Sequence, residues 1–175
     1  GEIFKYKGMA ETLEELGKTN CESFYRGAIA DAIDSYSRKT GGYLRKEDLA
    51  AYKAQWVEPI TTNYRGYDVW EIPPNGHGIV VLMALNILEG MDLSAGHDDP
   101  ETAHKIMEAL KLAFTDGKRY VADPRAMKPT VEQLLSRDYA AKRRALIGST
   151  ALEPKPGTPY CGDTVYLNAA DGDGN

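Results

Sequence analysis

Thr164 is the residue whose position in the sequence could make it a nucleophile. It stands between a stretch containing Pro154, Pro156 and Pro159 and a run of short apolar residues typical of a β-strand. Proline breaks regular structure because it has no amide donor and restricts the residue before it. If the Asp163–Thr164 bond is cut, Thr164 gains a free α-amine beside its own hydroxyl. An N-terminal amine in this place can activate a threonine for attack on a carbonyl.

The structural alternative for Thr164 is that it only opens a strand, since strand propensity alone favours threonine there. Three other groups of polar residues could have either a functional or a structural role. His77, His97 and His104 share no i, i+4 spacing on one helix, so the sequence predicts no metal site. The segment from Asp171 to Asn175 resembles the start of a calcium loop whose later positions would lie beyond this chain, and a tight turn is favoured.

A third group contains alternating charges, and it predicts a solvated face or a buried ion pair rather than an acid–base dyad. Its members are Asp116, Arg119, Asp123 and Arg125. The sequence predicts no cofactor.

The composition is that of a globular protein. The 175 residues are 42% hydrophobic and 27% charged, with a net charge of −5. No basic stripe exists, so nucleic acid is not expected as a partner. The longest apolar run, Gly78 to Leu88, is too short to span a membrane. Cys21 and Cys161 lack the spacing of a zinc site or a disulfide framework, and two free thiols are expected.

Apolar periodicity and capping residues predict a mostly helical α+β chain. The first helices are expected at 9–16, stopped by Gly17, then at 22–39 and 47–54. A hairpin or a bent two-part strand is expected from 60–64 and 67–72. Because Val69, Trp70 and Ile72 are large and apolar, this strand is expected to lie against the body of the protein. A buried helix follows at 78–89, capped by Gly90. Further helices are expected from Asp99–Pro100 to about 121, at a Thr130–Gln133 capping box, and over 136–147.

The tail 150–163 is expected to be flexible, and 164–175 to form a strand. A terminal strand followed by turn residues leaves backbone groups unpaired, so the chain is expected to be a piece of a longer protein.

Several motifs in order resemble the γ-glutamyltransferase (γ-glutamyltranspeptidase) family over almost the whole chain. They are Ala10–Leu13, Phe24–Gly27, Gly41–Gly42 with Glu47–Tyr52, Glu58–Pro59, Tyr64–Tyr67, Pro73–Pro74, Leu85–Gly90, Ala113–Phe114 with Asp116, Arg119–Tyr120 and Asp123–Pro124.

The resemblance implies an N-terminal-nucleophile hydrolase with a four-layer αββα fold, made as a precursor that cuts itself into two subunits. Residues 1–163 would be the C-terminal part of the large subunit, and 164–175 the first strand of the small one. In this family the threonine that begins the small subunit is the nucleophile, and an aspartate follows it seven residues later. Asp171 takes that place here, which puts the nucleophile on Thr164.

The implied reaction is cleavage of a γ-glutamyl amide such as glutathione through an acyl-enzyme, which passes to water or to an amino acid or peptide. The substrate-binding residues and oxyanion donors are expected outside this chain, so the piece alone is expected to be inactive. The small subunit of the same precursor is the implied protein partner. The family suggests a periplasmic or secreted protein, and the divergent branch a cytoplasmic one.

One departure from the family pattern leaves the substrate open. The usual Thr-Thr-His start is replaced by Thr164, Val165 and Tyr166, as in a divergent branch of the family. Classical transpeptidation and glutathione as substrate are therefore open to question. An acylase for other amides, such as a β-lactam side chain, is the alternative within enzymes, and a non-catalytic helical scaffold is the alternative outside them.

Overall fold

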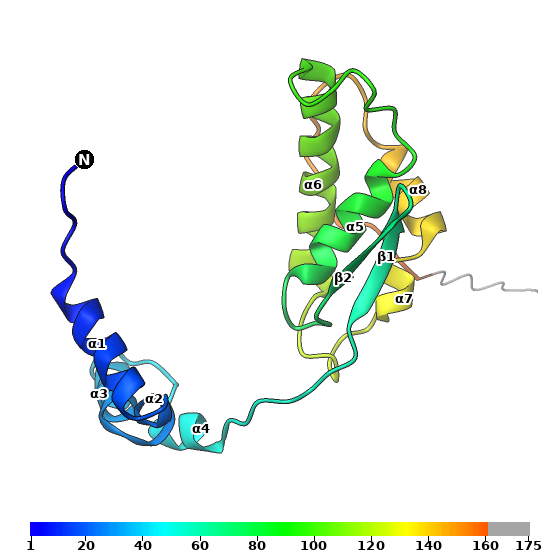
Figure 1. Ribbon diagram of the computed structural model, residues 1–175. Helices are drawn as coiled ribbons and strands as arrows, with labels where there is room; N and C mark the ends of the chain where they lie inside the picture. Colours follow the sequence, from blue (N-terminus) through cyan, green and yellow to red (C-terminus); the bar gives the residue numbers. More distant parts are fainter. Residues whose placement is uncertain (161–175) are drawn as a thin grey trace, which may run out of the picture. The chain divides into compact units, whose positions relative to one another are not determined.

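The computed structural model describes residues 1–160 and divides the chain into two compact units (Figure 1). The first unit is Gly1–Trp56, and the second begins at Val57. Each unit has its own packing, and each is described separately below.

The first unit is built from four helices: α1 (Lys7–Lys18), α2 (Glu22–Arg26), α3 (Ala28–Lys39) and α4 (Lys46–Ala51). The expected stop at Gly17 was wrong. Helix α1 runs through it and ends at Thr19, whose amide and hydroxyl both donate to the Glu15 carbonyl, at 3.1 and 2.8 Å. The helix stops because Asn20 and Cys21 have positive φ, 50° and 67°, and the Cys21 amide donates back to the Leu16 carbonyl at 2.8 Å.

The single helix expected over 22–39 is two helices that meet at Gly27. Gly27 has extended backbone angles and begins α3, where its carbonyl accepts from the Asp31 amide at 3.0 Å. A Cβ on Gly27 would lie 2.8 Å from the Ser23 Cα, closer than real Cβ atoms approach. The apolar periodicity continues across this corner, which is why it predicted one helix.

We expect Gly27→Ala to lower the stability of the first unit, because the added methyl forces the corner between α2 and α3 to open. The expected loss is roughly 1–3 kcal/mol, as for other overpacked sites. Gly17→Ala is the matched control, since its Cβ meets nothing within 4 Å and alanine favours a helix. Hydrogen exchange of the α3 amides in the full-length protein measures the stability of the first unit in both variants. Equal protection in the two variants would contradict the prediction.

The second unit begins with the hairpin of β1 (Ile60–Tyr64) and β2 (Tyr67–Glu71), which pair antiparallel with Thr62 opposite Val69. The turn residues Arg65 and Gly66 both have positive φ, 51° and 89°, as a two-residue hairpin turn requires.

The expectation that this strand lies against the body of the protein is confirmed, because β2 packs against α5, but only Val69 of its three large apolar residues is partly buried. Trp70 and Ile72 are 58% and 62% exposed, whereas Val69 lies on the half-buried face with Thr62. Side chains alternate along a strand, so Val69 and Trp70 cannot share a face.

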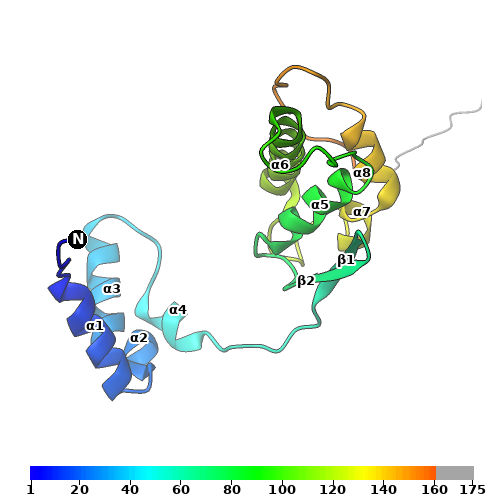
Figure 2. The same ribbon diagram turned by 45° about the horizontal axis from the view of Figure 1, so that its top comes forward.

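Helix α5 (Gly78–Leu88) is the centre of the second unit, packed against the hairpin and against α6 (Pro100–Tyr120) (Figure 2). It is apolar on nearly every side and buried, as expected. Its one buried polar residue, Asn86, accepts a hydrogen bond from the Thr62 hydroxyl and donates to the Leu135 carbonyl at 2.9 Å. These bonds join the hairpin, α5 and the start of the C-terminal region.

The predicted caps of the later helices are confirmed. Asp99 accepts from the Thr102 amide at 2.9 Å, and Pro100 is the first residue of α6. Thr130 and Gln133 form the capping box of α7 (Val131–Leu134). Helix α8 (Arg137–Arg144) begins at the Ser136 cap, as expected, and ends before the predicted 147.

Gly90 follows α5 for a reason other than the expected cap. Its φ is not positive, so the backbone does not require glycine. A Cβ at Gly90 would overlap the guanidinium of Arg144 on α8. Gly90 thus leaves room for an arginine side chain from a distant part of the sequence. Within residues 1–160, no helix has the length and apolar character needed to cross a membrane.

Candidate functional site: the segment that precedes Thr164

The predicted nucleophile and scissile bond, Thr164 and Asp163–Thr164, lie outside the described residues, as does the predicted strand 164–175. The structure does describe the segment that leads to them, as far as Tyr160. Its path is the nearest structural information on the candidate site.

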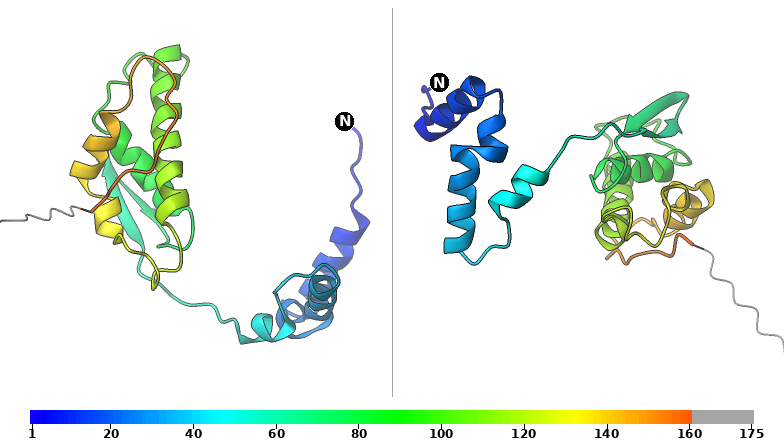
Figure 3. Two further views of the ribbon diagram at one scale, coloured as in Figure 1. Left: turned by 180° about the vertical axis from the view of Figure 1, so that it is seen from behind. Right: turned by 90° about the horizontal axis from the view of Figure 1, so that it is seen from below.

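Residues 152–160, here called the tail, run alongside α6 rather than moving freely (Figure 3). The Leu152 amide donates to Glu108 Oε2 at 3.2 Å, and the Lys111 Nζ donates to the Leu152 carbonyl at 2.6 Å. The expectation of a flexible tail was wrong for this part. The tail runs in the same direction as α6: Leu152 lies at Glu108, in the middle of the helix, and Gly157 lies at Tyr120, the last residue of the helix.

Proline-rich sequence suits this path. An extended proline-rich chain rises about 3.1 Å per residue, so the five steps from Leu152 to Gly157 span about 16 Å. The eight helical steps from Glu108 to Asp116 rise about 12 Å, which is a comparable length. A segment outside any sheet must find partners for its amides, and three prolines remove three of those donors.

Gly157 is held at both of its backbone polar groups by side chains. Its N–H donates to Asp116 Oδ1 at 2.8 Å, and its carbonyl accepts from the Tyr120 hydroxyl at 2.5 Å. The two peptide units that flank the Gly157 Cα are therefore both held by side chains of α6.

Asp116 is fully buried and makes two further contacts, both with α8. The Tyr139 hydroxyl donates to Asp116 Oδ2 at 2.9 Å, and Arg143 Nε lies 2.9 Å from the same oxygen as an ion pair, with its N–H not aligned for a hydrogen bond. Another nitrogen of Arg143 donates to the Lys155 carbonyl at 2.8 Å. We call Asp116, Tyr120, Tyr139 and Arg143 the tail clamp.

The electrostatics of the tail clamp suit holding rather than proton transfer. Burial raises the pKa of the Asp116 carboxyl, while the Gly157 amide and Arg143 act in the opposite direction. Burial and the Asp116 charge raise the pKa of the Tyr139 hydroxyl, which therefore remains a donor. Burial likewise raises the pKa of Tyr120. Both Asp116 oxygens already accept bonds from the protein, so the cluster holds the backbone of the tail.

Of the four charges singled out in the sequence, Arg119 is exposed, and the other three belong to two ion pairs. Asp116 is half of a buried ion pair, as one of the two expectations had it, with Arg143 as its partner. Asp123 and Arg125 form an exposed pair at 2.6 Å, and hydrogen bonding to Arg125 lowers the pKa of Asp123 to about 2. Tyr139, Arg143 and Gly157 were missed by sequence reasoning. The only available signal was a glycine among prolines.

Glu108 is the other buried acid that holds the tail. Its side chain is 3% exposed and pairs with Lys111 at 2.8 Å. Hydrogen bonding to Lys111 holds the pKa of Glu108 below its usual value of 4.5, in spite of its burial.

This lowered pKa predicts release of the tail by acid. A carboxyl whose pKa is lower in the folded state adds stability above its unfolded pKa, and that stability is lost as the pH falls through the folded value. We therefore expect the Leu152 amide, corrected for intrinsic exchange, to lose protection below about pH 4.5. Glu108→Gln should remove this pH dependence. An unchanged pH profile in the variant would show that Glu108 is not the group involved.

The histidines take ordinary structural places. His104 Nε2 lies 2.8 Å from the Gly148 carbonyl, beside a hollow of about 550 Å³ that includes Glu101 and Lys105. His97 is exposed beside Asp98, and His77 lies near Phe114. Among residues 1–160, no three His, Cys, Asp or Glu side chains are grouped as metal ligands. Cys21 is exposed; Cys161 and Asp171–Asn175 lie outside the described residues.

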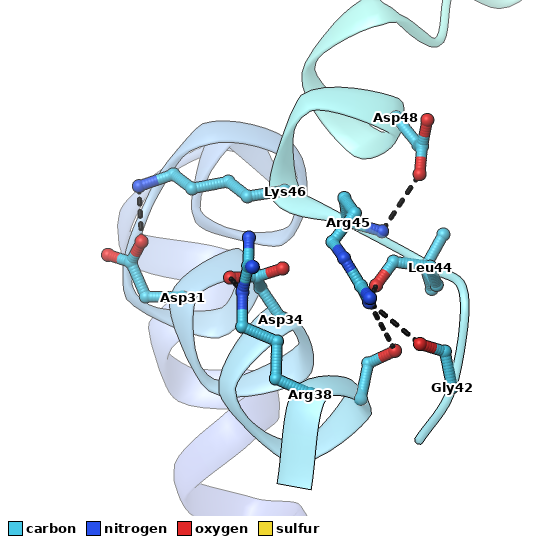
Figure 4. Close-up of polar contacts among 9 residues, drawn as sticks. Asp31, Asp34, Arg38, Gly42, Leu44, Arg45, Lys46 and Asp48 are labelled. Carbon is cyan, nitrogen blue, oxygen red and sulfur yellow. Dashed lines mark hydrogen bonds and ion pairs between the residues drawn. The ribbon is translucent and has the colours of Figure 1, made fainter. Parts of the chain in front are cut away.

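The motif around Gly41 and Gly42 has a structural role in the first unit (Figure 4). Gly41 has a φ of +73°, and Arg45 donates to the carbonyls of Gly42 and Leu44 at 2.8 and 2.9 Å. The Arg45 amide donates to Asp48 at 2.8 Å, which starts α4. An arginine therefore closes the turn. A hollow of about 710 Å³ along α1 and α3 is largely apolar.

The comparisons with known proteins agree with this architecture. The model of the γ-glutamyltranspeptidase family matches residues 1–175. The glutathione hydrolase-like YwrD proenzyme of Bacillus subtilis is 35% identical over the whole chain, which spans 33% of that protein.

Two solved structures are also similar. A cephalosporin acylase from Bacillus halodurans has 55% identity and a TM-score of 0.73, over 91% of this chain and 30% of that one. The Helicobacter pylori γ-glutamyltranspeptidase has 32% identity and a TM-score of 0.67, over 90% of this chain and 47% of that one.

These matches confirm the expected fold class, a mostly helical α+β chain that is part of the N-terminal-nucleophile hydrolase fold. The chain spans about a third of the length of the curated relative it matches. A family model that matches from the first residue to the last shows that this chain belongs to the γ-glutamyltranspeptidase family.

Proposed function

We propose that the full-length protein is a self-processing enzyme that cleaves γ-glutamyl amides, with Thr164 as its nucleophile. The observation that carries the proposal is the family match over residues 1–175, which includes Thr164 and the residues on both sides of it. The similar Bacillus subtilis protein is named a proenzyme, in agreement with processing of a precursor. Residues 1–163 would belong to the large subunit, and 164–175 would begin the small one.

Maturation follows from the chemistry of threonine. The Thr164 hydroxyl attacks the Asp163 carbonyl carbon, so that a C–O bond forms, the C–N bond breaks and the nitrogen takes a proton. Water then hydrolyses the ester and leaves the Asp163 carboxylate and a free Thr164 amine. No outside nucleophile is needed for the first step, because the hydroxyl and the carbonyl belong to neighbouring residues.

Turnover would use the same hydroxyl on a bound amide. The free amine of Thr164 acts as the base, directly or through water, and the γ-glutamyl group is transferred to the threonine oxygen as the amine leaves. Water, an amino acid or a peptide then takes the acyl group. Donors to the oxyanion are needed for this step, and we place them in the rest of the small subunit.

An acylase for other amides is the second candidate. It is favoured by the 55% identity with the Bacillus halodurans cephalosporin acylase and by Val165 and Tyr166 in place of the usual threonine and histidine. A scaffold without catalysis is the remaining alternative.

The test uses the full-length protein and two chromogenic probes, γ-glutamyl-p-nitroanilide and glutaryl-p-nitroanilide, which differ only in the α-amino group. We expect two pieces on a denaturing gel, Thr164 as a new N-terminus, and release at least about tenfold faster from the γ-glutamyl probe, since one recognised polar group contributes about 1.4 kcal/mol or more. Faster release from the glutaryl probe would favour the acylase. An uncut chain with no release would favour the scaffold.

A further inference from the structure

The tail clamp places charged and hydroxyl groups in the interior of the second unit, where apolar side chains could have packed. Asp116 is 0% and Arg143 4% exposed. A buried ion pair seldom adds stability over apolar side chains of the same volume, because desolvation offsets the attraction. What this pair does provide is hydrogen bonds of defined geometry: Asp116 accepts from the Gly157 amide, and Arg143 donates to the Lys155 carbonyl.

The fixed points lie close in sequence to the predicted scissile bond. Helix α8 ends at Arg144, and the tail is then held at Leu152 and again at Gly157. Of these hydrogen-bonded anchors, Gly157 is the nearer in sequence to the predicted scissile bond, six residues before Asp163.

We propose that the tail clamp is a positioning device for self-cleavage, which holds Gly157 so that the Asp163 carbonyl is presented to the Thr164 hydroxyl in one geometry. This inference rests on the proposed function. The clamp residues are positioning residues rather than catalytic ones, since they contact the tail backbone and no reacting atom. Alignment of this kind affects the rate strongly, because a misplacement of about 1 Å can cost a hundredfold.

Gly157 offers a selective way to disturb the clamp. A Cβ at this position would overlap the Tyr139 hydroxyl and lie 3.0 Å from Arg143 Cδ. Gly157→Ala therefore displaces the tail from its anchor while every clamp side chain remains. Gly148→Ala is the matched control, because its Cβ meets nothing within 4 Å and it lies in the same connection after α8.

The experiment follows cleavage of full-length precursor made by cell-free translation with a short pulse of labelled methionine. We expect Gly157→Ala to be cut at least about tenfold more slowly than wild type, because a misplacement of about 1 Å can cost up to a hundredfold in rate, and Gly148→Ala to be cut at the wild-type rate. Tyr139→Phe, which keeps the ring but loses the donor to Asp116, should also slow cleavage. Added hydroxylamine should not speed up the slow variants, because the block precedes the ester.

Leu82→Ala separates positioning from a general loss of stability. Leu82 is fully buried in α5 and belongs to neither of the two main core clusters. We expect this variant to be less stable but to be cut at the wild-type rate once folded. If it is slowed as much as Gly157→Ala, or if folded Gly157→Ala is cut at the wild-type rate, the proposal is overturned. An uncut wild-type protein would instead overturn the proposed function itself.

Discussion

Full-length protein carrying Thr164→Ala is expected to remain a single chain under conditions in which the wild type is cut in two. The substitution removes the only atom in the proposed scheme that attacks the Asp163 carbonyl. Deleting the nucleophile of a hydrolase lowers its rate on the order of a million-fold, so no product is expected on a denaturing gel. Release from the γ-glutamyl probe should be lost as well, since both steps use one hydroxyl.

Thr164→Ser is the control for this prediction, because it keeps a hydroxyl in the same place. We expect it to be cut and to give serine as the new N-terminus by mass analysis. Cleavage of the alanine variant at the same bond would show that another protease makes the cut. The chain would then be cut by another enzyme and would not cut itself.

Replacing Asp116 by alanine is expected to have the largest effect on stability. It leaves the buried Arg143 guanidinium without a counter-charge and deprives Tyr139 and Gly157 of their acceptor. Removing one partner of a buried ion pair typically costs about 3–5 kcal/mol. In native-state hydrogen exchange, this loss of stability raises the exchange rate of the most protected α6 amides by roughly a hundred- to a few-thousand-fold.

Two comparisons test this reasoning. Asp123→Ala removes the exposed partner of Arg125 and should leave α6 exchange unchanged, since surface ion pairs contribute little. The double variant Asp116→Leu with Arg143→Met removes both charges and should recover most of the protection. If Asp116→Ala exchanges like the wild type, the buried pair is not what holds α6, α8 and the tail together.

Local signals explain what could be predicted from the sequence. The caps at Asp99 and Thr130 act over three residues, and both are present. The apolar character of α5 predicted its burial correctly. The break at Gly27 was missed because the apolar stripe continues across it and the corner depends on a close approach to Ser23.

In the candidate site, too, the local features could be predicted from the sequence and the long-range contacts could not. Thr164 could be picked out because its significance depends on its neighbours in the sequence. The tail clamp could not, because Asp116 meets Tyr139 and Gly157 across separations of 23 and 41 residues. Contacts over such distances leave no periodic pattern, and a proline-rich segment with no visible anchor predicts mobility.

The contact between Gly90 and Arg144 has an evolutionary consequence. A side chain at 90 and an arginine at 144 compete for one volume, so a side chain added at 90 is harmful as long as the arginine is present at 144. Divergence at these two positions should therefore be ordered: shortening of residue 144 has to come first and opens the way for any residue at 90. Homologues that carry a bulkier residue at 90 are expected to have lost the arginine, and the two columns should covary.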